Sequence, residues 1–346
     1  MTSIRFSIVV PVFDGAGFVG ALLDSMPCPP PAGFELIVVD DHSRDDTLAV
    51  LDRHPLRPWL RLYRTPANAG PAAARNMGAS HASGALLLFF DADVVLLPDT
   101  LARVERYADA HPEVRCASGL DAPRSAAPGC VPDFHALWAH HALDRLPEGA
   151  VASAWNPRNG LLERALFHDL GGFDTRYRRA DVEDYALSRK ISAHTPIRFT
   201  RALEVAHRFG GLRTSTAAFF RRSAYWVRLA AETGQVDRTG HTRVANLPSV
   251  ACSAAIVAGL ALAPLLPTAA RAIPALVALQ ALLNASLLRF FVERAGLARG
   301  VAYLGLLIHF QATAALGAAV GAAQAGLDAL RAARAPSATA AAEGET

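Results

Sequence analysis

The residues that could do chemistry are carboxylates placed directly after apolar stretches of the chain. The four groups are Asp14-Gly15, Asp40-Asp41-His42-Ser43, Asp91-Ala92-Asp93 and Asp181-Val182-Glu183-Asp184. Alternate residues of an extended segment point to opposite sides, so one carboxylate of Asp91-Ala92-Asp93 can face a ribose while the other meets a divalent cation across a diphosphate. Mg²⁺ and Mn²⁺ suit such a site, because they combine a few protein oxygens with phosphate oxygens. For Asp40-Asp41 the alternative is a helix cap ahead of Asp45.

Two further polar residues are candidates for the same site. His207 follows a β-like run over 197–205 and could be a third ligand of a metal or a diphosphate; the alternative is a structural histidine. Asn159-Gly160 follows Trp155-Asn156-Pro157-Arg158 and could line a donor-sugar or acceptor pocket, although a turn explains the same residues.

The elements that must position these residues alternate along the first 210 residues. Strands are expected at 4–13, 34–40, 60–64, 85–90 and 114–118, with helices at 18–25, 45–53, 72–81 and 101–111. Parallel neighbours require crossover connections, so this alternation predicts an α/β fold with a mostly parallel sheet flanked by helices. Ligands of such sheets collect at the carboxyl ends of the strands, which is where the acidic groups lie.

Composition narrows the class of protein. The 346 residues carry 34 Lys and Arg against 31 Asp and Glu, a net charge of +3 that argues against nucleic acid as a partner. The four cysteines are far apart, which predicts neither a zinc site nor a disulfide framework. The N-terminus lacks the basic start and apolar core of a signal peptide, so the first domain is expected in the cytoplasm.

The apolar excess lies toward the C-terminus. No Asp, Glu, Lys or Arg occurs over 244–270, 272–288 or 300–327, and three membrane spans fit these runs. Arginines precede the first run and separate the second from the third, which places both regions in the cytoplasm by the positive-inside rule. Arg331 and Arg334 would then lie outside, against that rule. Aromatic residues and arginines are mixed over 219–228, which is typical of a helix at an anionic membrane surface; the alternative is that these arginines hold a diphosphate of the donor or of a polyprenyl carrier.

The sequence resembles the inverting family 2 glycosyltransferases, which have the GT-A fold. Six motifs occur in the family's order: Ser7-Ile8-Val9-Val10-Pro11-Val12-Phe13, Val38-Val39-Asp40-Asp41, Asn68-Ala69-Gly70-Pro71 through Arg75-Asn76, Asp91-Ala92-Asp93, Gly171-Gly172-Phe173-Asp174 and Glu183-Asp184. They cover about residues 4–210. His42 departs from the family pattern, where Gly or Asn is frequent.

The resemblance implies roles residue by residue. Pro11, Val12 and Phe13 would border the nucleotide base, Asp41 would bond it with support from Asp40, and Arg75 would lie near it. Asp91 would face the ribose and Asp93 the metal, with His207 as a further metal ligand and Asn159 in the nucleotide-sugar site. Asp184 would be the general base, with Glu183 as the second choice.

The expected function is a membrane-associated, Mn²⁺- or Mg²⁺-dependent transfer of a sugar from a nucleotide-diphosphate sugar, with a UDP-sugar as the first expectation. The acceptor would be a hydroxyl of a lipid-linked molecule or a glycan. Two alternatives are a polyprenyl-phosphate sugar synthase and a non-catalytic subunit of a polysaccharide assembly system. A nucleotidyltransferase is disfavoured, because Asp14-Gly15-Ala16-Gly17 has no basic residue.

The expected organisation has four parts. Residues 1–215 form the GT-A domain, and 216–243 form a basic, amphipathic interfacial helix. Residues 244–327 form a membrane domain with three transmembrane helices in the inner membrane, and 328–346 form a disordered tail.

Overall fold

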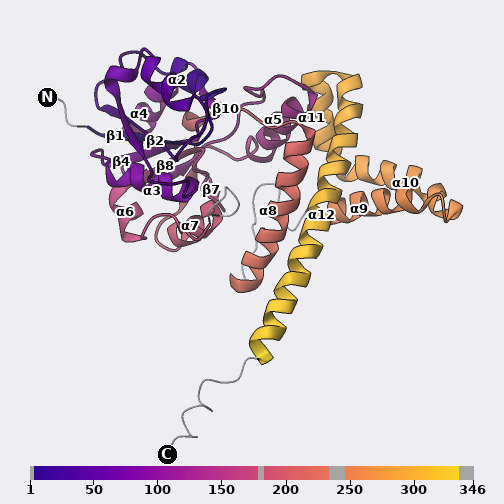
Figure 1. Cartoon of the computed structure of the whole chain (residues 1–346). Helices are drawn as coiled ribbons and strands as arrows, with labels where there is room; N and C mark the ends of the chain where they lie inside the picture. Colours follow the sequence, from indigo (N-terminus) through magenta and orange to yellow (C-terminus); the bar gives the residue numbers. More distant parts are fainter. Residues whose placement is uncertain (1–3, 178–182, 234–245, 335–346) are drawn as a thin grey trace, which may run out of the picture. The chain divides into compact units, whose positions relative to one another are not determined.

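The computed structural model describes residues 4–177, 183–233 and 246–334 (Figure 1). The chain divides into two compact units. The first contains residues 1–213 with 237–246 and 285–303, and the second contains 214–236, 247–284 and 304–346. The expected boundary at 215 lies close to the observed one. The expected division did not include residues 285–303 in the first unit.

The first unit is built on an eight-stranded sheet in the order β3-β2-β1-β4-β8-β6-β9-β7. Strands β1 (Phe6–Val12), β2 (Phe34–Asp40), β3 (Leu60–Arg64) and β4 (Leu86–Phe90) run parallel. Strand β8 (Asn159–Glu163) is antiparallel to β4 and to β6 (Cys116–Ser118). Strand β9 (Ile197–Phe199) pairs parallel with β6 and antiparallel with β7 (Val151–Ala152). The predicted α/β fold is therefore confirmed, and the five predicted strands correspond to β1–β4 and β6.

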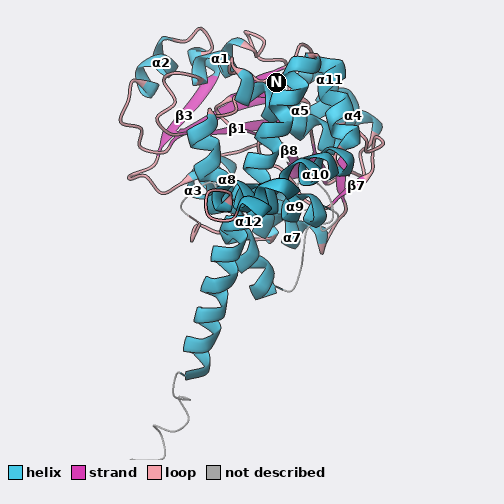
Figure 2. Cartoon of the chain, turned by 90° about the vertical axis from the view of Figure 1, so that its right-hand side faces the viewer, coloured by secondary structure: helices cyan, strands magenta, loops and turns pink. Residues whose placement is uncertain are grey.

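Helices cover both faces of this sheet, which is why every residue of β1 is buried (Figures 1 and 2). Even-numbered β1 residues such as Ile8 and Val10 pack with α1 (Val19–Asp24), α2 (Thr47–Arg53) and α4 (Thr100–Ala110). Val9 packs on the other face with α3 (Pro71–Ser80), α6 (Arg164–Asp169) and α7 (Glu183–Ser192). Strands buried on both faces read as continuous apolar runs, as these do.

Two further helices, a two-stranded sheet and two 3₁₀ helices complete the first unit. Helix α5 (Cys130–Leu143) packs against α11 (Ala285–Ala295), where the ring centroids of Phe134 and Phe291 are 5.6 Å apart. Strand β5 (Val94–Leu96) pairs antiparallel with β10 (Val205–His207) in a separate two-stranded sheet. Short 3₁₀ helices lie at Arg57–Trp59 and Arg201–Leu203.

The second unit is helical and contains most of α8 (Leu212–Thr233), α9 (Leu247–Leu262), α10 (Pro267–Leu283) and most of α12 (Leu297–Arg334). A buried polar network joins α9, α10 and α12. Gln280 donates through Nε2 to Gln311 Oε1 at 2.7 Å, and the hydroxyls of Ser249 and Ser253 donate to the same oxygen at 2.8 and 2.9 Å. Such polar contacts hold apolar helices together where apolar packing gives little specificity.

The three expected spans do not appear as three long helices. Among the described residues, Leu297–Arg331 is the one helix long and apolar enough to cross a membrane, and Pro267–Leu283 with Ala285–Ala295 passes only as a sharply bent pair. The first run gives the shorter helix Leu247–Leu262, because Pro264 and Pro267 interrupt it. Helix α12 continues to Arg334, which corrects the disordered tail expected from residue 328. Ala, Leu and Arg, which dominate 329–334, are strong helix formers. Residues 335–346 and part of the expected linker, 234–243, lie outside the described residues.

Helices α8 and α12 approach closely at two glycines of α12. A Cβ at Gly317 would lie 2.2 Å from the carbonyl oxygen of Phe220, and one at Gly321 would lie 2.3 Å from that of Ala224. The spacing Gly-x-x-x-Gly places both on one face of the helix.

We therefore expect Gly317→Ala to destabilise the helix pair by about 1–3 kcal/mol, because the added methyl group meets backbone atoms. The control is Gly305→Ala on the same helix, where nothing lies within 4 Å of the added atom; it should stabilise by up to about 1 kcal/mol through helix propensity. The measurement is the thermal unfolding midpoint of the full chain in detergent. Equal midpoints for the two variants would contradict the close approach.

Candidate active site

The predicted site residues gather at the carboxyl edge of the sheet. Asp40 ends β2, Asp41 follows it, and Asp91 follows β4 directly. Because β2, β1 and β4 run parallel, their carboxyl ends meet at one edge. Asn159 begins β8 at the same edge, since β8 is antiparallel and pairs Asn159 with Phe90.

Asp40 and Asp41 hold loops in this structure. Asp40 is fully buried, and its carboxylate lies 3.0 Å from Arg64 Nε and accepts from the Ser43 amide at 3.1 Å. Asp41 accepts from the Thr65 hydroxyl at 2.8 Å and from the amides of Ala69 and Gly70 at 3.0 and 2.7 Å. Asp41 therefore orders the loop that enters α3. Its bond to a base, and the supporting role of Asp40, stay predictions.

The residues predicted to border the base lie at the end of β1. Pro11 and Val12 are buried, and Val12 accepts the Asp41 amide through its carbonyl oxygen at 2.7 Å. Phe13 is 36% exposed, and its ring centroid lies 5.6 Å from the Arg44 guanidinium carbon. Phe13 is thus the member of the three whose side chain is open to a planar ligand.

Arg75 is a buried cation between two carboxylates. Its Nη2 donates to Asp91 Oδ1 at 2.6 Å and its Nη1 to Glu183 Oε1 at 3.1 Å, and the Phe173 ring centroid lies 5.3 Å from its Cζ. Burial by itself would lower the pKa of Arg75, but the charges of Asp91 and Glu183 outweigh burial and raise it. The sequence placed Arg75 near the base. The structure also makes it the link between α3, the end of β4 and the start of α7.

Asp93 and His207, predicted as metal ligands, lie side by side. The pairing of β10 with β5 sets His207 opposite Val94, and His207 Nε2 lies 3.3 Å from Asp93 Oδ2. Burial by itself would raise the pKa of Asp93, but His207 and then Arg158 lower it below its usual value. The lowered pKa of Asp93 favours its ionised form, which is the form that binds a cation.

This donor set fits a divalent cation that takes further ligands from phosphate. Two ligands about 2.1 Å from Mg²⁺ at adjacent octahedral positions stand about 3 Å apart, close to the observed separation of Asp93 and His207. Within the described residues, no three His, Cys, Asp or Glu side chains form a ready-made metal cluster. Any ion bound here would need oxygens from a diphosphate or from water.

Asp184 and Glu183 open α7 but have different surroundings. The Glu183 side chain is 4% exposed and paired with Arg75, whereas Asp184 is half-buried. Asp181, the first residue of the same acidic group, lies outside the described residues. Asp184 is therefore the more accessible carboxylate of the predicted pair.

Asn159 is fully buried, and in the described part of the chain neither Nδ2 nor Oδ1 of its side chain has a hydrogen-bond partner. Direct contact with a donor would require this part of the chain to move. The role of Asn159 in sugar binding stays a prediction.

Sequence reasoning missed Arg158 and Asp121. Arg158 Nη2 donates to Asp121 Oδ2 at 3.0 Å, and Asp121, Asp91, Asp93 and Asp184 raise the pKa of Arg158 against the lowering effect of burial. A basic residue just before a strand gives no sign by itself that the strand runs antiparallel. Only that direction brings Arg158 to the carboxyl edge of the parallel strands.

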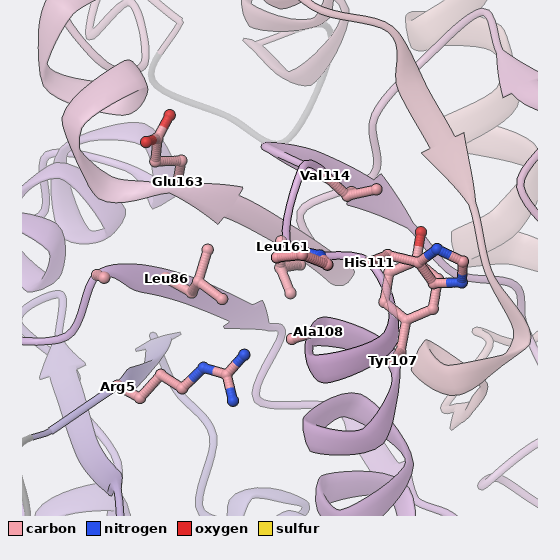
Figure 3. A pocket seen from close by; sticks show the side chains of 10 residues that line it. Arg5, Leu86, Tyr107, Ala108, His111, Val114, Leu161 and Glu163 are labelled. Atoms are coloured by element: carbon pink, nitrogen blue, oxygen red, sulfur yellow. The ribbon is translucent and has the colours of Figure 1, made fainter.

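The cavity in Figure 3 lies elsewhere. It has a volume of about 260 Å³ and is lined in part by Arg5, Leu86, Tyr107 and Glu163. Arg5 precedes β1 and Leu86 begins β4, so this cavity lies at the amino edge of the sheet. None of the predicted site residues lines it.

Comparisons with known proteins agree with this fold. A sequence model described as Glycosyl transferase family 2 matches residues 7–124. Over 110 residues the chain is 31% identical to poly(ribitol-phosphate) beta-N-acetylglucosaminyltransferase TarS of Staphylococcus aureus, a match that covers 31% of this chain and 19% of TarS. Over 113 residues it is 35% identical to a PGL/p-HBAD biosynthesis glycosyltransferase of Mycobacterium bovis, covering 32% of this chain and 44% of that protein.

A solved structure extends the likeness of fold. The mannosyltransferase PcManGT from Pyrobaculum calidifontis, in complex with GDP-Man and Mn²⁺, matches with a TM-score of 0.53 and 23% identity over 90% of this chain and 86% of that one. The fold is thus of the GT-A type. The likeness to the family 2 glycosyltransferases covers residues 7–124, and the chain spans less than half the length of the two curated relatives named here.

Replacement of Arg75 tests whether its ion pairs hold the site together. We expect Arg75→Met to lower the free energy of unfolding by about 3–5 kcal/mol, because it leaves Asp91 and Glu183 without their common partner. The control is Arg115→Met, whose side chain is 42% exposed and paired with Glu163, and which should cost about 1 kcal/mol or less. Urea unfolding followed by tryptophan fluorescence measures both. Equal losses would contradict a central role for Arg75.

Proposed function

We propose that the protein is a membrane-attached, metal-dependent inverting glycosyltransferase. It moves a sugar from a nucleotide-diphosphate sugar, with UDP-sugars as the first candidates, to a hydroxyl of a lipid-linked or glycan acceptor. The single observation that carries this proposal is the convergence of Asp91, Asp93, His207 and Glu183-Asp184 at the carboxyl edge of a GT-A sheet. The names of the relatives, which include a beta-N-acetylglucosaminyltransferase and a mannosyltransferase complexed with GDP-Man, support the class of donor.

The leaving group is a nucleoside diphosphate. Asp93 and His207 would hold a Mn²⁺ or Mg²⁺ ion, which supplies positive charge to a departing diphosphate when bound. Asp91 would meet the ribose with its second carboxylate oxygen, since the first already accepts from Arg75. Phe13 would stack on the base. Asp41 would lie nearby, because its backbone amide donates to the carbonyl oxygen of Val12, the residue before Phe13.

Asp184 would take the proton of the acceptor. The acceptor oxygen attacks the anomeric carbon from the face opposite the diphosphate, the bond between that carbon and the diphosphate oxygen breaks, and the hydroxyl proton passes to the Asp184 carboxylate. Glu183 is less suited to this role, because its buried carboxylate is held in place by its ion pair with Arg75. General-base assistance contributes roughly 10²- to 10⁴-fold to the rate.

We expect nucleoside-diphosphate release from one member of a panel of UDP-, GDP- and dTDP-sugars in native membranes, dependent on Mn²⁺ and abolished by EDTA. Asp184→Asn should lower that turnover at least about a hundredfold while donor binding persists. The control is Asp169→Asn, an exposed carboxylate at the end of α6. Near-normal turnover of Asp184→Asn would remove Asp184 from the role of base. Donor binding without release by the unaltered protein would favour a non-catalytic subunit.

Membrane attachment rests on the apolar surface of the second unit. Helix α12 is long enough to span a bilayer, and the turn between α9 and α10 exposes Leu265 and Leu266 at 78% and 53%. Exposed leucines at a tip flanked by apolar helices favour contact with lipid. An active site attached to a membrane suits a lipid-linked acceptor.

We expect the double variant Leu265→Asp, Leu266→Asp to be retained less than the unaltered chain in membrane vesicles after an alkaline carbonate wash. A charge near the middle of a bilayer costs about 2.5–3.5 kcal/mol. The control is Trp59→Asp, which changes an exposed apolar residue of the first unit. Equal retention of the double variant and the control would contradict insertion of this turn.

A further inference from the structure

Among the described residues, the predicted metal ligand His207 has no partner for the second ring nitrogen that usually orients such a ring. Its Nε2 faces Asp93, while within the described part of the chain its Nδ1 is buried without a hydrogen-bond partner. Ligating imidazoles commonly donate their second ring N–H to a carboxylate or carbonyl, which fixes the orientation of the ring. The orientation of His207 must therefore come from packing.

The packing partner is Phe209. The ring centroids of His207 and Phe209 are 4.4 Å apart with the planes at 81°, an edge-on contact. The Phe209 ring is itself held by His135, stacked at 5.7 Å and 26°, and by the guanidinium of Arg158, whose Cζ lies 5.9 Å from the ring centroid. Phe209 is thus fixed by neighbours other than His207.

Asp121 fixes Arg158. Its carboxylate accepts from Arg158 Nη2 at 3.0 Å, and the Asp121 side chain is only 6% exposed. The backbone of Asp121 bridges to Val205, the first residue of β10, and the next amide, that of Ala122, donates to the Val205 carbonyl at 2.7 Å. The support for Arg158 and the strand that carries His207 are therefore joined.

The same loop also holds the backbone at His207. The Ser125 hydroxyl and the Ala126 amide both donate to the His207 carbonyl oxygen at 3.0 Å. The Phe209 amide donates to Ser125 Oγ at 3.3 Å. Backbone bonds locate the residue but leave rotation of its side chain open, and the edge-on contact with Phe209 restricts that rotation together with the contact to Asp93.

We propose that Asp121, Arg158 and Phe209, called here the Phe209 stack, position the His207 imidazole toward Asp93 and thereby set the affinity of the chain for a divalent cation. The three are positioning residues, since they act through His207. The proposal rests on the proposed metal-dependent function and adds residues that the sequence motifs do not contain.

The charge of Arg158 allows this role to be separated from simple electrostatics. Arg158 is a cation close to Asp91, Asp93 and Asp184, so its charge repels a bound metal ion. If charge were its whole influence, Arg158→Gln would tighten Mn²⁺ binding. A positioning role predicts the opposite, because the Phe209 ring loses its support.

The test is Mn²⁺ binding to the full chain in detergent, followed by electron paramagnetic resonance with Mn²⁺ alone and with UDP or GDP. We expect Phe209→Leu and Arg158→Gln each to weaken Mn²⁺ binding about 10- to 100-fold. Arg158→Lys keeps the charge but loses the planar group and should be intermediate. The nitrogen hyperfine coupling of imidazole-bound Mn²⁺ should be reduced in Phe209→Leu, a signature that a general loss of stability would not produce.

The matched control is Arg201→Gln. Arg201 also lies over a phenylalanine ring, 5.2 Å from the centroid of Phe199, and also pairs with an acid, Asp144, but it lies apart from His207. The Mn²⁺ affinity of Arg201→Gln should equal that of the unaltered chain. Thermal unfolding shows which variants fold. If Phe209→Leu does not fold, Arg158→Gln alone tests the proposal.

Two results would overturn the proposal and differ in what they leave standing. In the first, His207→Ala weakens Mn²⁺ binding, but Phe209→Leu leaves affinity and nitrogen coupling unchanged or Arg158→Gln tightens binding. The metal site then stands, and the Phe209 stack has no positioning role. If His207→Ala leaves Mn²⁺ binding unchanged, the proposed metal site and the stack both fall.

Discussion

The ion pairs of Arg75 are the interaction on which the rest of the site depends. A buried guanidinium costs free energy unless carboxylates surround it, and here Asp91 and Glu183 come from segments about ninety residues apart in the chain. Their joint attraction to one cation fixes the end of β4 relative to the start of α7. The predicted ribose contact and the predicted base are therefore parts of one charged cluster, and Asp184 takes its place because its neighbour Glu183 is tied to Arg75.

A second set of constraints operates at the opposite side of the same cluster. The short pairing of β5 with β10 turns the chain after Asp93 so that His207 returns beside it. Three residues per strand give few backbone hydrogen bonds, and the loop around Asp121 to Ala126 supplies the rest. Arg158 thus has two roles: its charge balances nearby carboxylates, and its guanidinium packs on the Phe209 ring.

Much of the fold was readable from local patterns. The strands over 34–40 and 60–64 were predicted with their observed limits, because apolar runs bounded by turn residues are a short-range signal. Asp40, Asp41 and Asp91 were located for the same reason, since each follows such a run. The helices after residue 244 were harder to predict. Composition shows that a segment is apolar, but not whether it continues as one long helix, as α12 does, or is interrupted near prolines, as between α9 and α10.

The sequence by itself determined the class of fold, the parallel half of the sheet and the acidic residues at its edge, because residue type and spacing act within a few positions along the chain. Only the tertiary structure decided that β8 runs antiparallel, that Arg158 reaches the acidic cluster and that Arg75 joins Asp91 to Glu183. It also decided that Asp41 orders a backbone loop and that Asn159 is buried. These features depend on strand direction and on contacts between distant segments, which are set by the burial of the whole core rather than by any local pattern.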